Sequence, residues 1–84
     1  MSILTPAQPD LGHLRRRLRD QRDLPSPAER QTLREKAGLS RYDIAVTVRV
    51  TRNAVINWET GRCEPRGENL ARYVEVLRQL RAAS

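Results

Sequence analysis

The stretch from Ser40 to Gly61 constrains the fold of this chain more than any other part of the sequence. It predicts two short helices, over residues 41–48 and 52–60, joined by a tight turn. The first has one apolar face, because its apolar residues recur at i, i+1 and i+4; they are Ile44, Ala45 and Val48. The same face continues past the turn through Val50, Val55 and Trp58. The pattern favours an all-α protein.

The opposite side of the second helix is mostly polar. We expect it to expose Arg52, Asn53, Ile56, Asn57 and Thr60. Arginine and asparagine carry forked donors and acceptors that match the edges of guanine and adenine in the major groove of DNA. Ile56 could contact a thymine methyl group, or it could be an ordinary surface residue. This helix is therefore a candidate reader of double-stranded DNA.

A third helix is predicted before these two, because Ser26-Pro27-Ala28-Glu29 places Ser at the N-cap, Pro at N1 and Glu at N3. Leu33 and Ala37 are predicted to face inward, and Gly38 to end the helix in the left-handed conformation.

The two central helices have their own boundary signals. Ser40 and Asp43 repeat the capping pattern for residues 41–48, Thr51 caps residues 52–60, and Gly61 closes them. Arg49 lies in the turn, where a positive φ costs a side-chain-bearing residue roughly 1 kcal/mol.

The two flanks of this unit carry apolar stripes of their own. Residues 1–9 are predicted to be a disordered lead, and residues 10–24 a basic amphipathic helix capped by Asp10. That helix has one stripe of leucines among many arginines: Leu11, Leu14 and Leu18. The last helix, about residues 68–82, has a core stripe of Leu70, Val74 and Leu77, and beside it a second stripe of Tyr73, Val76 and Leu80. Either the N-terminal leucines or a second subunit should cover the second stripe.

Composition limits the class of protein. With 84 residues the chain allows one domain, which we place at residues 25–84. The net charge of +6 points to a polyanionic partner, although the near-absence of lysine could also reflect GC-rich coding. Only three aromatic residues are present, which disfavours stacking on single-stranded bases. No apolar run approaches 18 residues, so no membrane partner is expected.

The inventory of reactive groups is small. There is one histidine, His13, and one cysteine, Cys63, which fits a cytoplasmic protein without disulfides. No pair of histidines has metal-ligand spacing, and no glycine-rich phosphate loop is present. We therefore expect no enzyme activity, no metal, no cofactor and no small-molecule substrate.

The segment LREKAGLS, followed by Ile-Ala and then by V-T-R-x-x-V-x-x-W-E-x-G, resembles the phage repressor/Cro-like (XRE) helix-turn-helix family. The resemblance is close over residues 33–61 and looser over the last helix. Two features depart from the family pattern: Arg49 stands where the family usually has Gly, and the helix at residues 41–48 begins with Tyr42-Asp43. The resemblance implies a compact bundle of four or five helices, to which this chain adds an N-terminal helix.

The resemblance also implies roles for individual residues. Helix 52–60 would enter the major groove, and base reading would fall on Arg52, Asn53 and Asn57. Contacts to the DNA backbone would come from Ser40, Arg41, Thr51, Thr60 and Arg62. Arg34 would form a structural ion pair with Glu59. The family mostly binds inverted repeats as homodimers, and many members are repressors.

The sequence thus predicts a sequence-specific double-stranded-DNA-binding transcriptional regulator. An alternative is an antitoxin-like or adaptor protein whose main partner is another protein. The alternative rests on the apolar stripes of the first and last helices, which would then be its binding surface.

Overall fold

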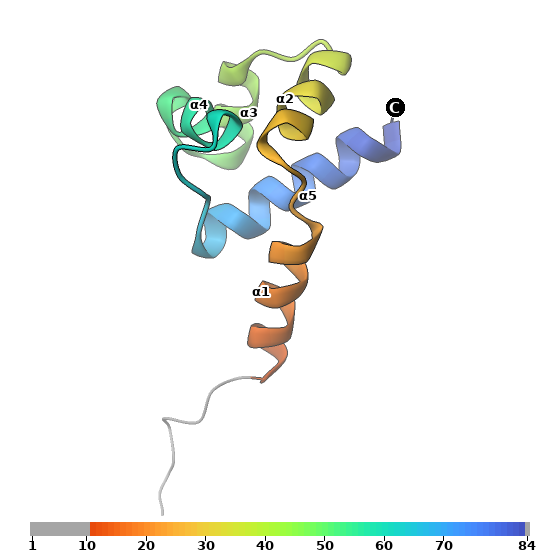
Figure 1. Cartoon of the computed structure of the whole chain (residues 1–84), viewed down its shortest axis with the longest axis vertical. Coiled ribbons are helices and arrows are strands. Elements are labelled where there is room, and N and C mark those ends of the chain that lie inside the picture. Colours follow the sequence, from red (N-terminus) through yellow and green to blue (C-terminus); the bar gives the residue numbers. More distant parts are fainter. Residues whose placement is uncertain (1–10, 84) are drawn as a thin grey trace, which may run out of the picture.

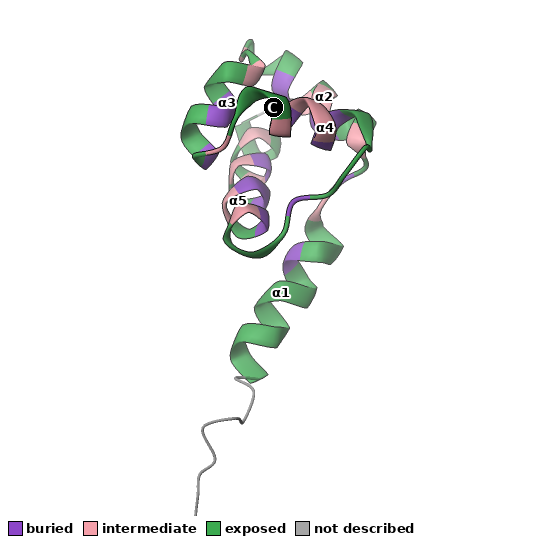
Figure 2. Cartoon of the chain, turned by 90° about the vertical axis from the view of Figure 1, so that its left-hand side faces the viewer, coloured by how far each residue is buried: buried purple, intermediate pink, exposed green. Residues whose placement is uncertain are grey.

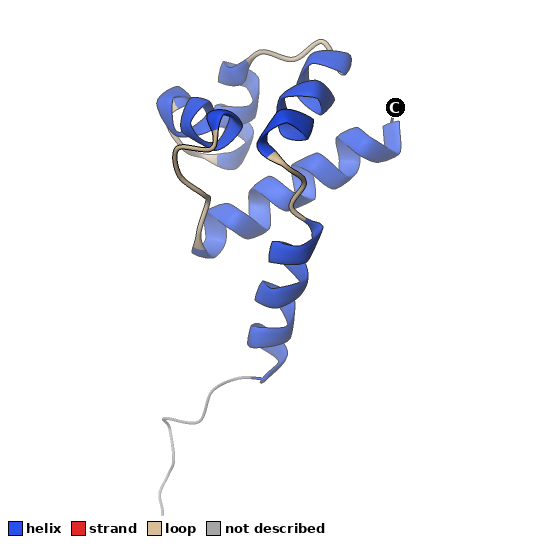
Figure 3. Cartoon of the chain, viewed as in Figure 1, coloured by secondary structure: helices blue, strands red, loops and turns tan. Residues whose placement is uncertain are grey.

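The structure is a computed structural model that describes residues 11–83. Five helices make up its regular structure in this range. They are α1 (Leu11–Asp23), α2 (Pro27–Lys36), α3 (Arg41–Val48), α4 (Arg52–Thr60) and α5 (Gly67–Ala83). No strand occurs within this range (Figure 3). Helices α2, α3 and α4 gather along α5, while α1 extends away from them (Figure 1). The predicted all-α bundle with an added N-terminal helix is confirmed; the predicted lead and the Asp10 cap lie outside the described residues.

Side-chain caps set the start of each central helix. The Oγ of Ser26 accepts from the backbone N–H of Glu29 at 3.3 Å. At the start of α3 the capping box is complete, since Asp43 N–H donates to Ser40 Oγ at 3.1 Å and Ser40 N–H donates to Asp43 Oδ2 at 2.8 Å. The bond from the Ser40 backbone lowers the pKa of Asp43. Thr51 Oγ1 accepts from Ala54 N–H at 3.1 Å, so the predicted caps are confirmed.

The turn between α3 and α4 has the strained geometry that the sequence predicts. Arg49 has a φ of 69°, and its backbone N–H donates to the carbonyl of Ala45 at 2.8 Å. From α5, Arg72 Nε donates to the carbonyl of Val48 at 2.8 Å and so satisfies an acceptor that the end of α3 leaves open. The turn is therefore held from both sides, which offsets the cost of a left-handed arginine.

The core lies where α3, α4 and α5 meet. Its buried apolar residues are Ile44, Ala45, Val48, Val55, Trp58, Leu70, Tyr73, Val74 and Leu77. The rings of Trp58 and Tyr73 are tilted against each other with centroids 4.7 Å apart. This arrangement corrects the prediction for Tyr73, which is only 1% exposed and belongs to the core rather than to an outer stripe. Burial also raises the pKa of the Tyr73 phenol. Ala37 is exposed, contrary to prediction, because α2 ends at Lys36 and Ala37 caps it.

Helix α1 packs on α5 through its polar side. Arg78 of α5 donates to Asp20 at 3.1 Å and to Asp23 at 2.6 Å, and the bond to Asp23 raises the pKa of Arg78. Asp20 is buried, yet most of α1 is exposed (Figure 2). The three leucines of α1 remain exposed at 62%, 41% and 58%. The prediction that the N-terminal leucines cover the outer stripe of α5 is therefore wrong, because α1 exposes these leucines to solvent.

Candidate nucleic-acid interface

Helix α4 has one side in the core and one side outside. Val55 is fully buried and Trp58 is 4% exposed. On the other side Arg52 and Asn53 are exposed, while Ile56 and Asn57 are half-buried. Residues three and four apart share a face of a helix, so Asn53, Ile56 and Asn57 form one outward strip that begins at the N-terminus of α4.

Exposed polar side chains and backbone donors lie together at the N-terminus of α4. Arg52 is the first helical residue and follows the Thr51 cap. The first turn of a helix carries backbone N–H groups without intrahelical acceptors, and the helix dipole adds partial positive charge there. Thr51 satisfies one of these donors. The end of α4 therefore favours an anion, and the Arg52 guanidinium adds a full positive charge to it.

The start of α3 lies beside the start of α4. A hollow of about 350 Å³ between them is lined by Arg34, Glu35, Ser40, Arg41, Tyr42 and Arg52. It thus unites two predicted backbone-contact residues, Ser40 and Arg41, with the predicted base reader Arg52. Tyr42 was not predicted as a site residue, although it is 64% exposed and borders this hollow. Its position could have been inferred from the sequence, because Tyr42 follows Arg41 in the first turn of a helix whose N-cap is Ser40.

The carboxylate of Glu59 ties three helices together beneath this surface. Arg34 of α2 donates to it through Nε at 2.7 Å and through a terminal nitrogen at 3.0 Å, and this bonding raises the pKa of Arg34. Arg41 of α3 donates a third bond, from Nε, at 3.0 Å. The predicted pair of Arg34 and Glu59 is present, while the share taken by Arg41 was not predicted. The Glu59 side chain is 1% exposed, so the carboxylate is shielded from water.

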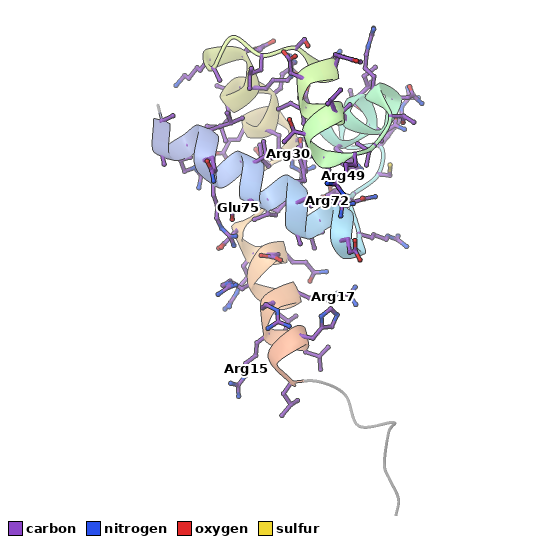
Figure 4. All side chains as sticks on the ribbon, turned by 180° about the vertical axis from the view of Figure 1, so that it is seen from behind. Arg15, Arg17, Arg30, Arg49, Arg72 and Glu75 are labelled. Atoms are coloured by element: carbon purple, nitrogen blue, oxygen red, sulfur yellow. The ribbon has the colours of Figure 1, made fainter. Side chains whose placement is uncertain are left out.

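A second buried arginine of α2 also holds the C-terminal part of α4. Arg30 is 2% exposed and donates to the carbonyls of Pro25 at 2.7 Å and Trp58 at 2.8 Å. Its guanidinium also meets the carboxylate of Glu64 at 2.6 Å, and it lies inside the body of the protein (Figure 4). Arg30 was not predicted from the sequence. The signal was its spacing, since it lies four residues before Arg34 on the same face of α2.

The remaining predicted residues are less closely grouped. The Thr60 hydroxyl donates to the carbonyl of Ile56 at 2.9 Å, so its proton is used within α4. The structure therefore does not place a free donor at Thr60. Arg62 is exposed in the loop that follows α4. Its backbone N–H donates to Asn57 at 2.9 Å, which fixes the start of that loop at the C-terminal end of the outward strip.

Other kinds of site are not visible in the described part of the chain. Within residues 11–83, no group of three or more His, Cys, Asp and Glu side chains is placed to hold a metal ion. None of the helices in that range is both long and apolar enough to span a membrane. Cys63 is an exposed free thiol.

Two short capped helices, a tight turn and an outward polar strip at the second helix define the class of DNA-binding helix-turn-helix proteins. A helix-turn-helix family model matches residues 31–81, which is more than half of the chain. The chain therefore belongs to the Cro/C1-type (XRE) helix-turn-helix family of DNA-binding regulators. The match begins within α2, so α1 lies outside it. No curated protein matches the sequence significantly, and no solved structure matches the chain.

Proposed function

We propose that the chain is a sequence-specific double-stranded-DNA-binding transcriptional repressor of the cytoplasm that binds an inverted repeat as a homodimer. Helix α4 enters the major groove, and Arg52, Asn53 and Asn57 read base edges, with Ile56 against a thymine methyl group. Ser40, Arg41, Thr51 and Arg62 contact the DNA backbone. The observation that carries the proposal is the split of α4, which buries Val55 and Trp58 and exposes Arg52 and Asn53 at its tip.

The hollow between the starts of α3 and α4 supports separate groups of residues for phosphate contact and for base reading. Ser40, Arg41 and Arg52 line it together, and no lysine or arginine of α1 does. Three arginines line this hollow, and the two more exposed ones, Arg41 and Arg52, would meet a phosphate there together with the positive ends of two helices; Glu35 is the one carboxylate at its edge. Such contacts give affinity and a salt dependence but carry no sequence information. Asn53 and Asn57, further along the strip, would then determine most of the base preference. Arg52 would contact both the phosphate and a base edge.

The test is a selection of binding sites from random duplex DNA, followed by affinity measurements on the selected site and on a scrambled one. We expect a symmetric motif with half-sites about one helical turn apart. Asn57→Ala should weaken binding to the selected site by roughly 1–3 kcal/mol and relax its base preference.

Arg62→Ala is the matched control, because Arg62 is exposed near the strip but lies outside α4. It should weaken both DNAs equally and reduce the salt slope by about one. If the two variants acted alike on scrambled DNA, base reading by α4 would be wrong. A chain that selects no motif at all would favour the protein-partner alternative.

A further inference from the structure

Helix α1 shows its apolar side to solvent. Asp20, on the side opposite the leucines, is held by Arg78 of α5 at 3.1 Å. His13, Arg16 and Arg17 border the space between α1 and the start of α5. On the outer side Leu18 lies in a hollow with Arg15, Gln21 and Arg22, and Arg15 projects away from the body (Figure 4). We call this outer side, with Leu11, Leu14, Leu18, Arg15 and Arg22, the arm face. It is apolar along its middle and basic at its edges.

An apolar groove lies on another part of the molecule, between α3 and the C-terminal half of α5. Its volume is about 430 Å³, and it is lined by Leu39, Asp43, Ile44, Thr47, Glu75, Val76, Gln79 and Leu80. No residue of α1 lines it. Val76 and Leu80 pack against the core but stay partly exposed here. The two charged residues at this groove, Asp43 and Glu75, are both acidic; Asp43 also accepts from the Ser40 backbone at 2.8 Å, and Glu75 lies 3.4 Å from Arg78 on its own helix.

The arm face and the groove are complementary in two independent ways. Each presents a short row of aliphatic side chains, and their charges are opposite, since the hollow at Leu18 has two arginines and the groove has two carboxylates. One pair from each surface has the same spacing: Leu14 and Leu18 are one helical turn apart, as are Val76 and Leu80. We propose that the arm face of one copy of this chain docks in the groove of a second copy, reciprocally, so that a two-fold axis closes the pair.

Charge selects a second copy in this orientation over two other arrangements. Two arm faces packed on each other would bring arginines against arginines, because both acidic residues of α1 lie on the side that faces Arg78 of α5 and not on the arm face. Nucleic acid would satisfy the arginines but would leave the three leucines in water. The groove offers an apolar bed and acidic edges at once. The inference deepens the homodimer of the proposed function, but it concerns protein–protein contact and is tested without DNA.

The experiment is sedimentation equilibrium of the full chain in the absence of DNA. We expect a reversible dimer, and we expect Leu14→Ser to raise its dissociation constant at least about tenfold by removing an apolar contact at each of two interfaces. Val46→Ser is the matched control: Val46 is 56% exposed on α3 and belongs to neither surface, so its removal should leave association unchanged. Circular dichroism shows that each variant is folded.

Charge reversal identifies the pairing of the two surfaces. One chain carries Arg15→Glu with Arg22→Glu on the arm face, and another carries Glu75→Arg with Gln79→Arg at the groove. Each should associate weakly with itself, whereas an equal mixture of the two should associate as the unaltered chain does, because both reciprocal contacts regain opposite charges.

Three results would overturn the proposal: a monomer at all concentrations, a dimer that Leu14→Ser leaves intact, or a mixture without recovery. Leucine-dependent binding of the monomer to anionic vesicles would assign the arm face to a lipid surface instead. If the chain stayed monomeric but still selected a DNA motif, the interface would fail while base reading by α4 stood.

Discussion

Helices α1 and α4 are both amphipathic, yet they face the protein with opposite sides. Helix α4 buries Val55 and Trp58 and leaves its polar strip outside. Helix α1 packs Asp20 on α5 and leaves its leucines exposed. The periodicity of a helix thus predicts that it has an apolar side, but the contacts that the helix makes with the rest of the protein decide where that side points. In α1 those contacts are ionic and involve one arginine of α5.

The largest effect expected from this contrast is at the buried side of α4. Trp58→Ala should lower the free energy of unfolding by about 3–5 kcal/mol, because a nearly buried ring packed on Tyr73 leaves a cavity. Chemical denaturation followed by circular dichroism measures the loss. A change below about 1 kcal/mol would mean that Trp58 is not part of the cooperative core.

The next largest effect should follow from neutralising the carboxylate under the α4 surface. Glu59→Gln keeps the shape of the side chain but leaves Arg34 and Arg41 without their counter-charge, so we expect a loss of about 2–3 kcal/mol. Glu64→Gln is the control. Its carboxylate also meets a buried arginine but is 57% exposed, so solvent can replace it. Equal losses of stability from the two changes would contradict the view that the shielded Glu59 carboxylate matters more than the exposed Glu64 carboxylate.

A smaller loss of stability should follow from replacing Asp43 at the start of α3, and only at a pH where its carboxylate is charged. The folded-state pKa of Asp43 lies below its ordinary value of 3.8, so its charge stabilises the fold above that value and ceases to do so as the pH falls through the folded pKa. Asp43→Asn keeps an acceptor for the Ser40 backbone but cannot ionise. Unfolding curves of the two proteins should differ at neutral pH and converge in strong acid. A difference that persists there would point to shape rather than charge.

The smallest effect is expected on α1. Leu14→Ala should change the free energy of unfolding by no more than about 0.5 kcal/mol at the lowest protein concentration that the assay permits, because Leu14 is exposed within one chain. Denaturation at increasing concentration should then separate the variant from the unaltered protein, because only the latter gains stability from association. A loss of several kcal/mol in dilute protein would mean that α1 repacks with its leucines inward.

Much of the fold could be predicted from the sequence, because local signals determine it. The caps at Ser26, Ser40 and Thr51 and the left-handed turn at Arg49 act within three or four residues. The orientation of α1 could not be predicted in the same way, since it depends on an arginine 58 positions from its partner Asp20.

Tyr73 was misplaced for a related physical reason. It lies between the two stripes of α5, and only the position of the Trp58 ring assigns it to the core. In the candidate site, the pair of Arg34 and Glu59 was predictable from the family resemblance, and its geometry is present. The third bond, from Arg41, was not predictable, because the distance between Arg41 and Glu59 depends on how α3 and α4 are placed relative to each other. The DNA roles of the strip residues stay predictions.

The unequal sharing of Glu59 has a consequence for how the protein could engage an anion. Arg34 supplies two of the three bonds to that carboxylate from inside, whereas Arg41 supplies one from a side chain that is 32% exposed. A phosphate that drew Arg41 outward would leave the inner pair whole. Helix α4 would keep its position, because Arg34 would still hold Glu59 while Arg41 of α3 bonded the phosphate. Binding of an anion would therefore require no rearrangement of the core.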